Sequence, residues 1–240
     1  MMKKIIQTLV ATMCTALLLF PTTIYAQNRF TVNGKVDFVS DYIWRGIDQN
    51  SGFSVQPSLT LGYSGFSVNV WGSQTLSRWN AESPAKEFDV NLSYSLNNFS
   101  ITVSDYWWYG VNQPYGHYKD SHFFEGTLAY CLSESFPLTL SWSTMFAGAD
   151  KNEEGKLQGS TYINASYPIS LPADITLTPA IGFTPWKGYY QNKSAFTDVS
   201  LKANKNIKVT DKFSIPVFIQ TIVAPVYDRT YLIAGFGLGF

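Results

Sequence analysis

Apolar and small polar side chains alternate along most of the chain from residue 30 to residue 240. In the first such segment Phe30, Val32 and Phe38 fall on one face, whereas Asn33 and Lys35 fall on the other. Successive side chains of a β-strand point to opposite faces, so a period of two predicts strands; no helical i, i+3, i+4 stripe of useful length competes with it. The pattern predicts twelve strands, at residues 30–38, 53–63, 66–70, 87–94, 99–107, 122–132, 138–146, 160–167, 175–183, 195–209, 213–223 and 230–240.

The connections between these segments alternate in length. Short connections fall at residues 64–65, 96–98, 133–137, 168–174 and 210–212, and long ones at 41–51, 75–86, 108–121, 147–157, 184–194 and 224–229. Outer-membrane barrels have even strand numbers and pair short periplasmic turns with longer external loops. The sequence therefore predicts an all-β fold, a transmembrane antiparallel β-barrel of twelve strands with both termini on the periplasmic side. A soluble antiparallel sandwich is the alternative that alternation alone leaves open.

One face of the predicted strands is almost free of charge, as a lipid-facing surface requires. The exceptions are Asp105, His122 and Lys205, all near strand ends. Aromatic residues gather at the short-turn ends, where rings with a polar edge suit a headgroup boundary. In lipid every strand amide needs a partner, which a closed ring supplies. We therefore expect outer-membrane lipid to contact this face.

Three prolines interrupt the pattern. Pro57, Pro179 and Pro216 fall inside predicted strands. Proline lacks the amide hydrogen that the ladder uses, so it is normally confined to edges and bulges. We therefore expect displaced strand boundaries or bulges at these positions.

The amino terminus has the pattern of a secretory signal peptide. Lys3 and Lys4 precede a short apolar run at residues 9–20, and Ala26 offers a small residue for cleavage. The run is too short for a membrane-spanning helix. Cleavage after residue 26 leaves residues 27–240 as the barrel domain, with a formal charge of −2. We therefore expect an exported protein of the bacterial outer membrane.

The composition excludes several classes of protein. Hydrophobic residues make up 45% of the chain and charged residues 14%, which is too apolar for a disordered chain. Seventeen basic residues balance seventeen acidic ones, so the basic excess of a nucleic-acid binder is absent. Two cysteines form neither a disulfide framework nor a metal cluster. We expect no nucleic acid, metal or other cofactor.

Two stretches resemble known families. The carboxyl terminus alternates Phe236, Leu238 and Phe240, which resembles the signature that outer-membrane barrels present to their assembly machinery. A second set of motifs resembles the TorF-type porins, a family also catalogued as bacterial proteins of unknown function. These motifs are Ser40-Asp41-Tyr42, Arg45-Gly46, Gln49, Gly65-Phe66, Trp71-Gly72-Ser73, Glu87, Asp89 and Tyr94. The resemblance is strongest over residues 40–130, and it implies a pore without naming a solute.

The Asp-Tyr-x-x-Arg-Gly stretch lies where the first strand leaves the membrane. Asp41 and Arg45 are spaced so that they can pair, or clamp the first external loop against the barrel wall, and Gly46 can supply a turn. The stretch is either a structural element of the barrel rim or a constriction that meets solute.

Twelve strands tilted by about 40° enclose a backbone radius of roughly 12 Å, which small polar side chains do not fill. Water can therefore enter unless a loop folds in. The candidate pore-lining charges are Lys35, Asp37, Glu87, Asp89, Glu125, Asp198 and Lys202. Their acidic surplus favours cations or neutral solutes, as acidic rings do in other pores. The alternative is that the carboxylates pair with lysines and hydroxyls and only hold the shape of the barrel.

These observations favour a channel for the passive diffusion of small hydrophilic solutes. A barrel lipid hydrolase is disfavoured, because neither His117 nor His122 has a serine at the same-face spacing that a strand-borne nucleophile requires. A non-conducting barrel with adhesive loops remains open, since residues 104–118 are rich in tyrosine and tryptophan. We expect no enzymatic activity.

Overall fold

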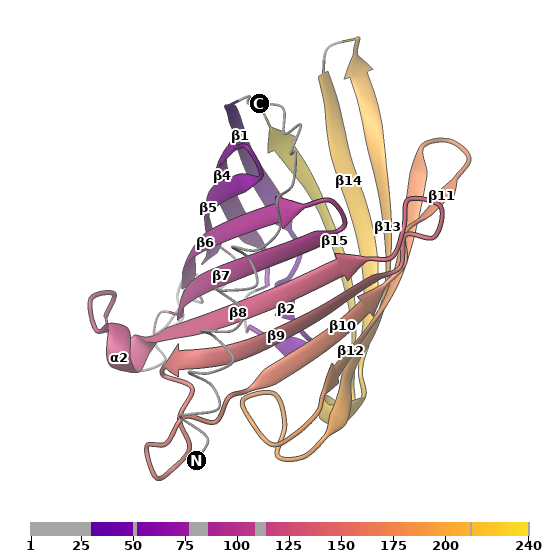
Figure 1. Ribbon diagram of the computed structural model, residues 1–240. Coiled ribbons are helices and arrows are strands. Elements are labelled where there is room, and N and C mark those ends of the chain that lie inside the picture. The colour runs from indigo at the N-terminus through magenta and orange to yellow at the C-terminus, as the bar shows by residue number, and fades with distance from the viewer. Residues whose placement is uncertain (1–29, 50–51, 77–85, 109–113, 212, 240) are drawn as a thin grey trace.

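The computed structural model describes residues 30–49, 52–76, 86–108, 114–211 and 213–239, and these residues form a β-barrel (Figure 1). The expected signal peptide, residues 1–26, lies outside them, as does Phe240. The strands are β1 (Thr31–Val39), β2 (Ile43–Trp44), β3 (Ile47–Asp48), β4 (Ser54–Tyr63), β5 (Phe66–Thr75), β6 (Lys86–Leu96), β7 (Phe99–Trp108), β8 (His122–Cys131), β9 (Thr139–Gly148), β10 (Thr161–Ser166), β11 (Ile169–Leu171), β12 (Ile175–Thr184), β13 (Ala195–Thr210), β14 (Phe213–Ala224) and β15 (Arg229–Gly239). Helix α2 (Tyr118–Ser121) and the 3₁₀ turn η1 (Pro225–Tyr227) complete the described elements. None of the described helices has the length and apolar character of a membrane span.

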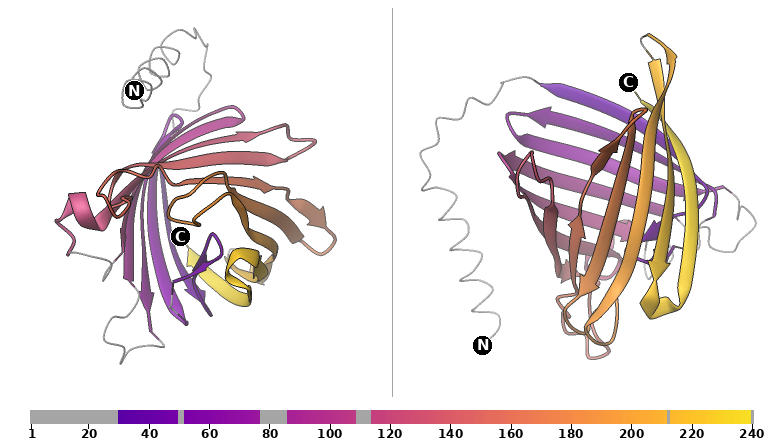
Figure 2. Two further views of the ribbon diagram at one scale, coloured as in Figure 1. Left: turned by 90° about the horizontal axis from the view of Figure 1, so that it is seen from below. Right: turned by 90° about the vertical axis from the view of Figure 1, so that its right-hand side faces the viewer.

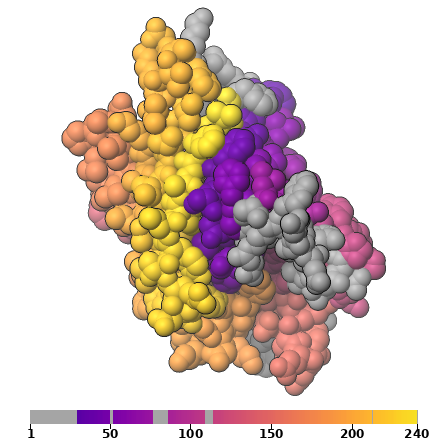
Figure 3. Space-filling model, turned by 180° about the vertical axis from the view of Figure 1, so that it is seen from behind, coloured from indigo at the N-terminus to yellow at the C-terminus, as the bar shows by residue number. Residues whose placement is uncertain are grey.

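The sheet closes on itself. Its order is β10-β9-β8-β7-β6-β5-β4-β1-β15-β14-β13-β12-β11, and β10 also pairs with β12. Strands β10 and β11 both pair with β12, so they are two pieces of one barrel strand. The ring therefore has twelve antiparallel strands, which confirms the predicted fold (Figure 2). The first and last strands lie side by side, as the indigo and yellow surfaces of Figure 3 show.

The two faces of the wall differ as the alternation predicts. Outward residues are exposed and apolar, as in Leu92, which is 54% exposed, and Leu232, which is 68% exposed. At the short-turn end aromatic rings pack on one another, with the Phe66 and Tyr94 centroids 4.5 Å apart. Inward positions carry mainly hydroxyl, amide and charged groups. An apolar outer band with an aromatic edge is the surface of a transmembrane barrel.

The prolines do not cause the expected bulges. Pro57 keeps its register with β1, opposite Val36, and only the ladder toward β5 is interrupted there. Pro216 pairs with β13, and β14 begins to pair with β15 one residue later, at Val217. Each proline therefore lies beside a gap in the ladder, where no amide hydrogen is required. The irregularities in register lie elsewhere, for example at Phe124.

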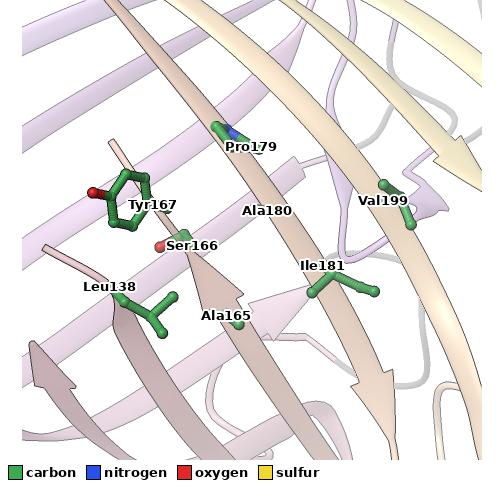
Figure 4. Close-up of a pocket in the computed structure, with 8 residues that line it drawn as sticks. All are labelled: Leu138, Ala165, Ser166, Tyr167, Pro179, Ala180, Ile181 and Val199. Atoms are coloured by element: carbon green, nitrogen blue, oxygen red, sulfur yellow. The ribbon is translucent and has the colours of Figure 1, made fainter. Parts of the chain in front are cut away.

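Pro179 faces a break in the neighbouring strand. It keeps its register with β13, but on its other side β10 ends at Ser166 and β11 begins at Ile169. The break leaves an apolar groove of about 300 Å³ on the outer face (Figure 4). It is lined by Leu138, Ala165, Ser166, Tyr167, Pro179, Ala180, Ile181 and Val199.

Candidate functional site

The first long connection forms a small hairpin, β2 and β3, that turns into the barrel. Its central residues Arg45 and Gly46 both have positive φ, 53° and 81°. Positive φ at both central positions is typical of a type I′ turn, the tightest hairpin connection. Asp41 holds the base of the loop, because its Oδ1 accepts hydrogen bonds from the amides of Tyr42 (2.9 Å) and Gly52 (2.8 Å). The Arg-Gly motif is therefore the tip of an anchored hairpin.

The tip contacts distant parts of the barrel wall. The Arg45 guanidinium donates two hydrogen bonds to the Glu125 carboxylate on β8, at 2.6 and 2.7 Å, and a third to the Tyr190 hydroxyl. Its carbon also lies 4.5 Å from the ring centroid of Tyr162 on β10. A Cβ on Gly46 would lie 2.7 Å from the Thr197 carbonyl oxygen on β13. The hairpin therefore crosses the lumen from β1 to both β8 and β13.

Aromatic side chains fill the space around this tip. Trp108 lies 5.2 Å from Trp44 and 4.6 Å from Phe123 between ring centroids. Met145 is 0% exposed and Tyr190 1%. The whole cluster consists of Trp108, Phe123, Met145, Tyr162 and Tyr190, packed against Trp44, Ile47, Tyr106 and Ala149. We call the hairpin and this cluster the plug; it occupies the long-loop end of the lumen.

The Arg45–Glu125 pair is buried, since the two side chains are 13% and 0% exposed. Burial alone would lower the pKa of Arg45, but Tyr190 and Glu125 raise it above its ordinary value, so the guanidinium stays charged. Tyr106 also donates to Glu125 at 3.0 Å. A bidentate pair with its remaining lone pairs satisfied is the geometry in which a buried ion pair is tolerated.

We expect the Gly46→Ala substitution to loosen the plug. The new methyl would collide with the Thr197 carbonyl, and alanine in the left-handed region costs about 1–2 kcal/mol. The hairpin should therefore become more accessible, which limited proteolysis of the folded barrel measures. Gly155→Ala is the matched control, since it has a similar φ of 73° and open space around it. Equal cleavage of the two variants would contradict the close fit of the tip.

The structure places some of the residues predicted from the sequence in or beside the plug and others elsewhere on the inner wall. The Arg45 guanidinium does not pair with Asp41, the first alternative that the spacing allowed; it pairs with Glu125 on β8 and so fastens the first long loop to the barrel wall, as the second alternative predicts. Asp198 accepts hydrogen bonds from Tyr162 and Thr197. Glu87 and Asp89 are 6% and 7% exposed, beside Tyr42, which directly precedes β2. Lys35 pairs with Asp37 at 2.8 Å, and Lys202 lies 4.2 Å above the Phe218 ring.

Sequence reasoning missed a pair on the outer face. His122 Nδ1 lies 2.7 Å from Asp105 Oδ1, and the ring of Tyr118 covers the imidazole with centroids 4.1 Å apart. The alternation places both Asp105 and His122 on the outer face, and two polar residues on an otherwise apolar face could have indicated that they pair. The hydroxyl of the adjacent Ser121 donates to the carbonyls of Pro114 and His117.

The loop that carries α2 is tethered to the next long connection. Lys151 donates to the Asp120 carboxylate at 2.9 Å, and this bond lowers the pKa of Asp120. Among the described residues no group of three or more His, Cys, Asp or Glu side chains is arranged to hold a metal ion.

The fold and the plug together define a class: a transmembrane β-barrel whose first long loop folds into its own lumen. The chain belongs to the bacterial proteins of unknown function designated Gcw_chp, whose family model matches residues 24–228. This match confirms the expected kinship with bacterial proteins of unknown function, and the TorF-type name stays a prediction. No curated protein matches the sequence.

Several solved structures are similar to this chain. The KdgM porin is 9% identical with a TM-score of 0.48, and the match covers 87% of this chain and 97% of that one. The COG4313 outer membrane channel from Pseudomonas putida F1 is 15% identical with a TM-score of 0.43, over 92% and 100% of the two chains. OmpF of Salmonella typhi, in complex with daunomycin, is 8% identical with a TM-score of 0.37, over 90% and 99%.

Proposed function

We propose that the protein is an outer-membrane channel through which small hydrophilic solutes diffuse, and that the plug is its constriction. The observation that carries the proposal is the contrast between the two ends of the lumen. The long-loop end is filled by a hairpin that Arg45 holds through side-chain contacts, whereas the inward positions of the other strands carry mainly polar and charged side chains, Lys35, Asp37 and Lys202 among them. The hairpin is not a strand of the wall, so its displacement would leave the ring of strands intact and widen the path.

The surroundings of the barrel follow from the same proposal. Outer-membrane lipid covers the apolar face, since exposed residues such as Leu92 and Leu232 need an apolar solvent. The last strand alternates outward Phe236 and Leu238, and we propose that the assembly machinery recognises it at its end, Phe240.

Conductance tests the proposal directly. The mature chain, purified in detergent and added to a planar bilayer, should give discrete current steps whose size is small for a twelve-stranded wall, because the plug narrows the path. Folded protein is verified beforehand by its resistance to unfolding in detergent at room temperature. A folded, inserted barrel that gives no steps under any applied voltage would overturn the channel and would support the non-conducting, adhesive barrel instead.

A further inference from the structure

Only some of the charged residues predicted to line the pore are exposed to a solute. Of the expected acidic residues, Glu87, Asp89, Glu125 and Asp198 are 6%, 7%, 0% and 6% exposed. Their burial in the wall and plug removes them from the open part of the lumen. By contrast, the side chains of Lys35 and Asp37 are 43% and 23% exposed. Lys202 is also partly exposed.

The three accessible charges lie on one wall of the barrel, where glycines make room for them. Strand β15 turns Gly235 and Gly237 toward the lumen. A Cβ on Gly237 would lie 2.5 Å from Asp37 Oδ1 and 2.9 Å from Lys35 Cε. A Cβ on Gly235 would lie 2.5 Å from the Phe218 ring. The side chains of Lys35, Asp37 and Phe218 can therefore lie close against β15.

Lys202 carries the uncompensated charge of this wall. Lys35 is neutralised by Asp37, at 2.8 Å. The ammonium of Lys202 lies 4.2 Å from the centroid of Phe218 and makes no ion pair with any residue of the described chain. A ring face attracts a cation without cancelling its charge, so the group remains able to bind an anion. The accessible wall thus has one net positive charge.

We infer that this wall is a binding site for small anionic solutes, such as carboxylates, and that Lys202 determines the charge selectivity of the channel. The inference rests on the proposed function, because it assigns a solute class to the same lumen. Lysine and arginine groups in a pore select anions through their charge. The sign is opposite to the cation preference that the acidic surplus of the sequence predicts.

Reversal potentials in a potassium chloride gradient test the inference. The wild-type channel should prefer chloride, and Lys202→Gln should lower the chloride-to-potassium permeability ratio about fivefold, the effect of one unit charge at about 4 Å in water. Lys202→Arg should retain the preference. Lys205→Gln is the matched control: it removes a lysine from the same strand, but from the outer face, and should change nothing.

A second readout uses citrate as an anionic probe. Millimolar citrate should reduce the current of the wild-type channel and have less effect on Lys202→Gln. A conducting channel that prefers potassium, or in which Lys202→Gln and Lys205→Gln behave alike in both assays, would overturn the anion site and leave the channel intact. A folded wild-type barrel that conducts nothing would overturn both.

Discussion

Replacing Arg45 with alanine is expected to enlarge the single-channel conductance and lengthen the open state. The substitution removes the bonds to Glu125 and Tyr190 and leaves the Glu125 carboxylate buried without its cation. Breaking a buried pair in this way costs about 3–5 kcal/mol. If the hairpin bears that cost, the equilibrium between seated and displaced hairpin shifts by about two orders of magnitude or more. Single-channel current recordings measure both the conductance and the lifetime of the open state.

Two variants distinguish the Arg45 contacts from a general effect. Arg45→Lys keeps the charge but loses the bidentate geometry, so an intermediate conductance is expected. Arg229→Ala removes an arginine from the exposed start of β15, and it should conduct like the wild type. Arg45→Ala channels with wild-type step size and lifetime would show that the plug does not limit the current.

Leu59→Arg is expected to destabilise the barrel by about 2–4 kcal/mol, the cost of an arginine on the lipid face near the bilayer midplane. Leu59 lies midway along β4 and is 42% exposed on the outer face. Its neighbour Thr60 faces the lumen, where an arginine reaches water. Thr60→Arg should therefore cost much less. Urea unfolding of both variants in lipid vesicles measures the difference.

The comparison of adjacent residues tests the orientation of the whole wall. A shift of one residue in the register would exchange the two faces. In that case Thr60→Arg, and not Leu59→Arg, would be the destabilising change. Equal losses in the two variants would contradict a barrel with one lipid face and one aqueous face.

The ring of strands was predictable because the sequence pattern that indicates each strand extends over only a few neighbouring residues. Alternation over about ten residues fixes which side chains face lipid, and the lengths of the connections fix the up-and-down order. The bulges expected at the prolines are absent. Pro57 and Pro216 stay within their strands, because a gap in the hydrogen-bond ladder lies beside each and no amide hydrogen is needed there. Such gaps depend on the neighbouring strand, which the local sequence does not specify.

The sequence allowed Arg45 to clamp the first external loop against the barrel wall, but it did not predict the partners of the plug. Arg45 is 80 residues from Glu125 and 145 from Tyr190, so no local spacing points to these partners. The near neighbour Asp41 was the better candidate by sequence distance, yet it bonds loop amides. Composition likewise counts carboxylates without showing which of them are buried. The sign of the accessible charge therefore required the three-dimensional arrangement.

The sequence separation of these contacts has a consequence for biogenesis. A contact between residues far apart in the sequence requires the closure of a long loop, which costs conformational entropy before the contact can stabilise the fold. Such contacts therefore tend to form late in folding. The hairpin tip needs β8, β13 and the segment after β12 in place, and Glu125 and Tyr190 follow Arg45 in the chain by 80 and 145 residues. Only a nearly finished ring can therefore accept the tip. Until those segments are paired, the long-loop end of the lumen lacks the contacts that hold the plug.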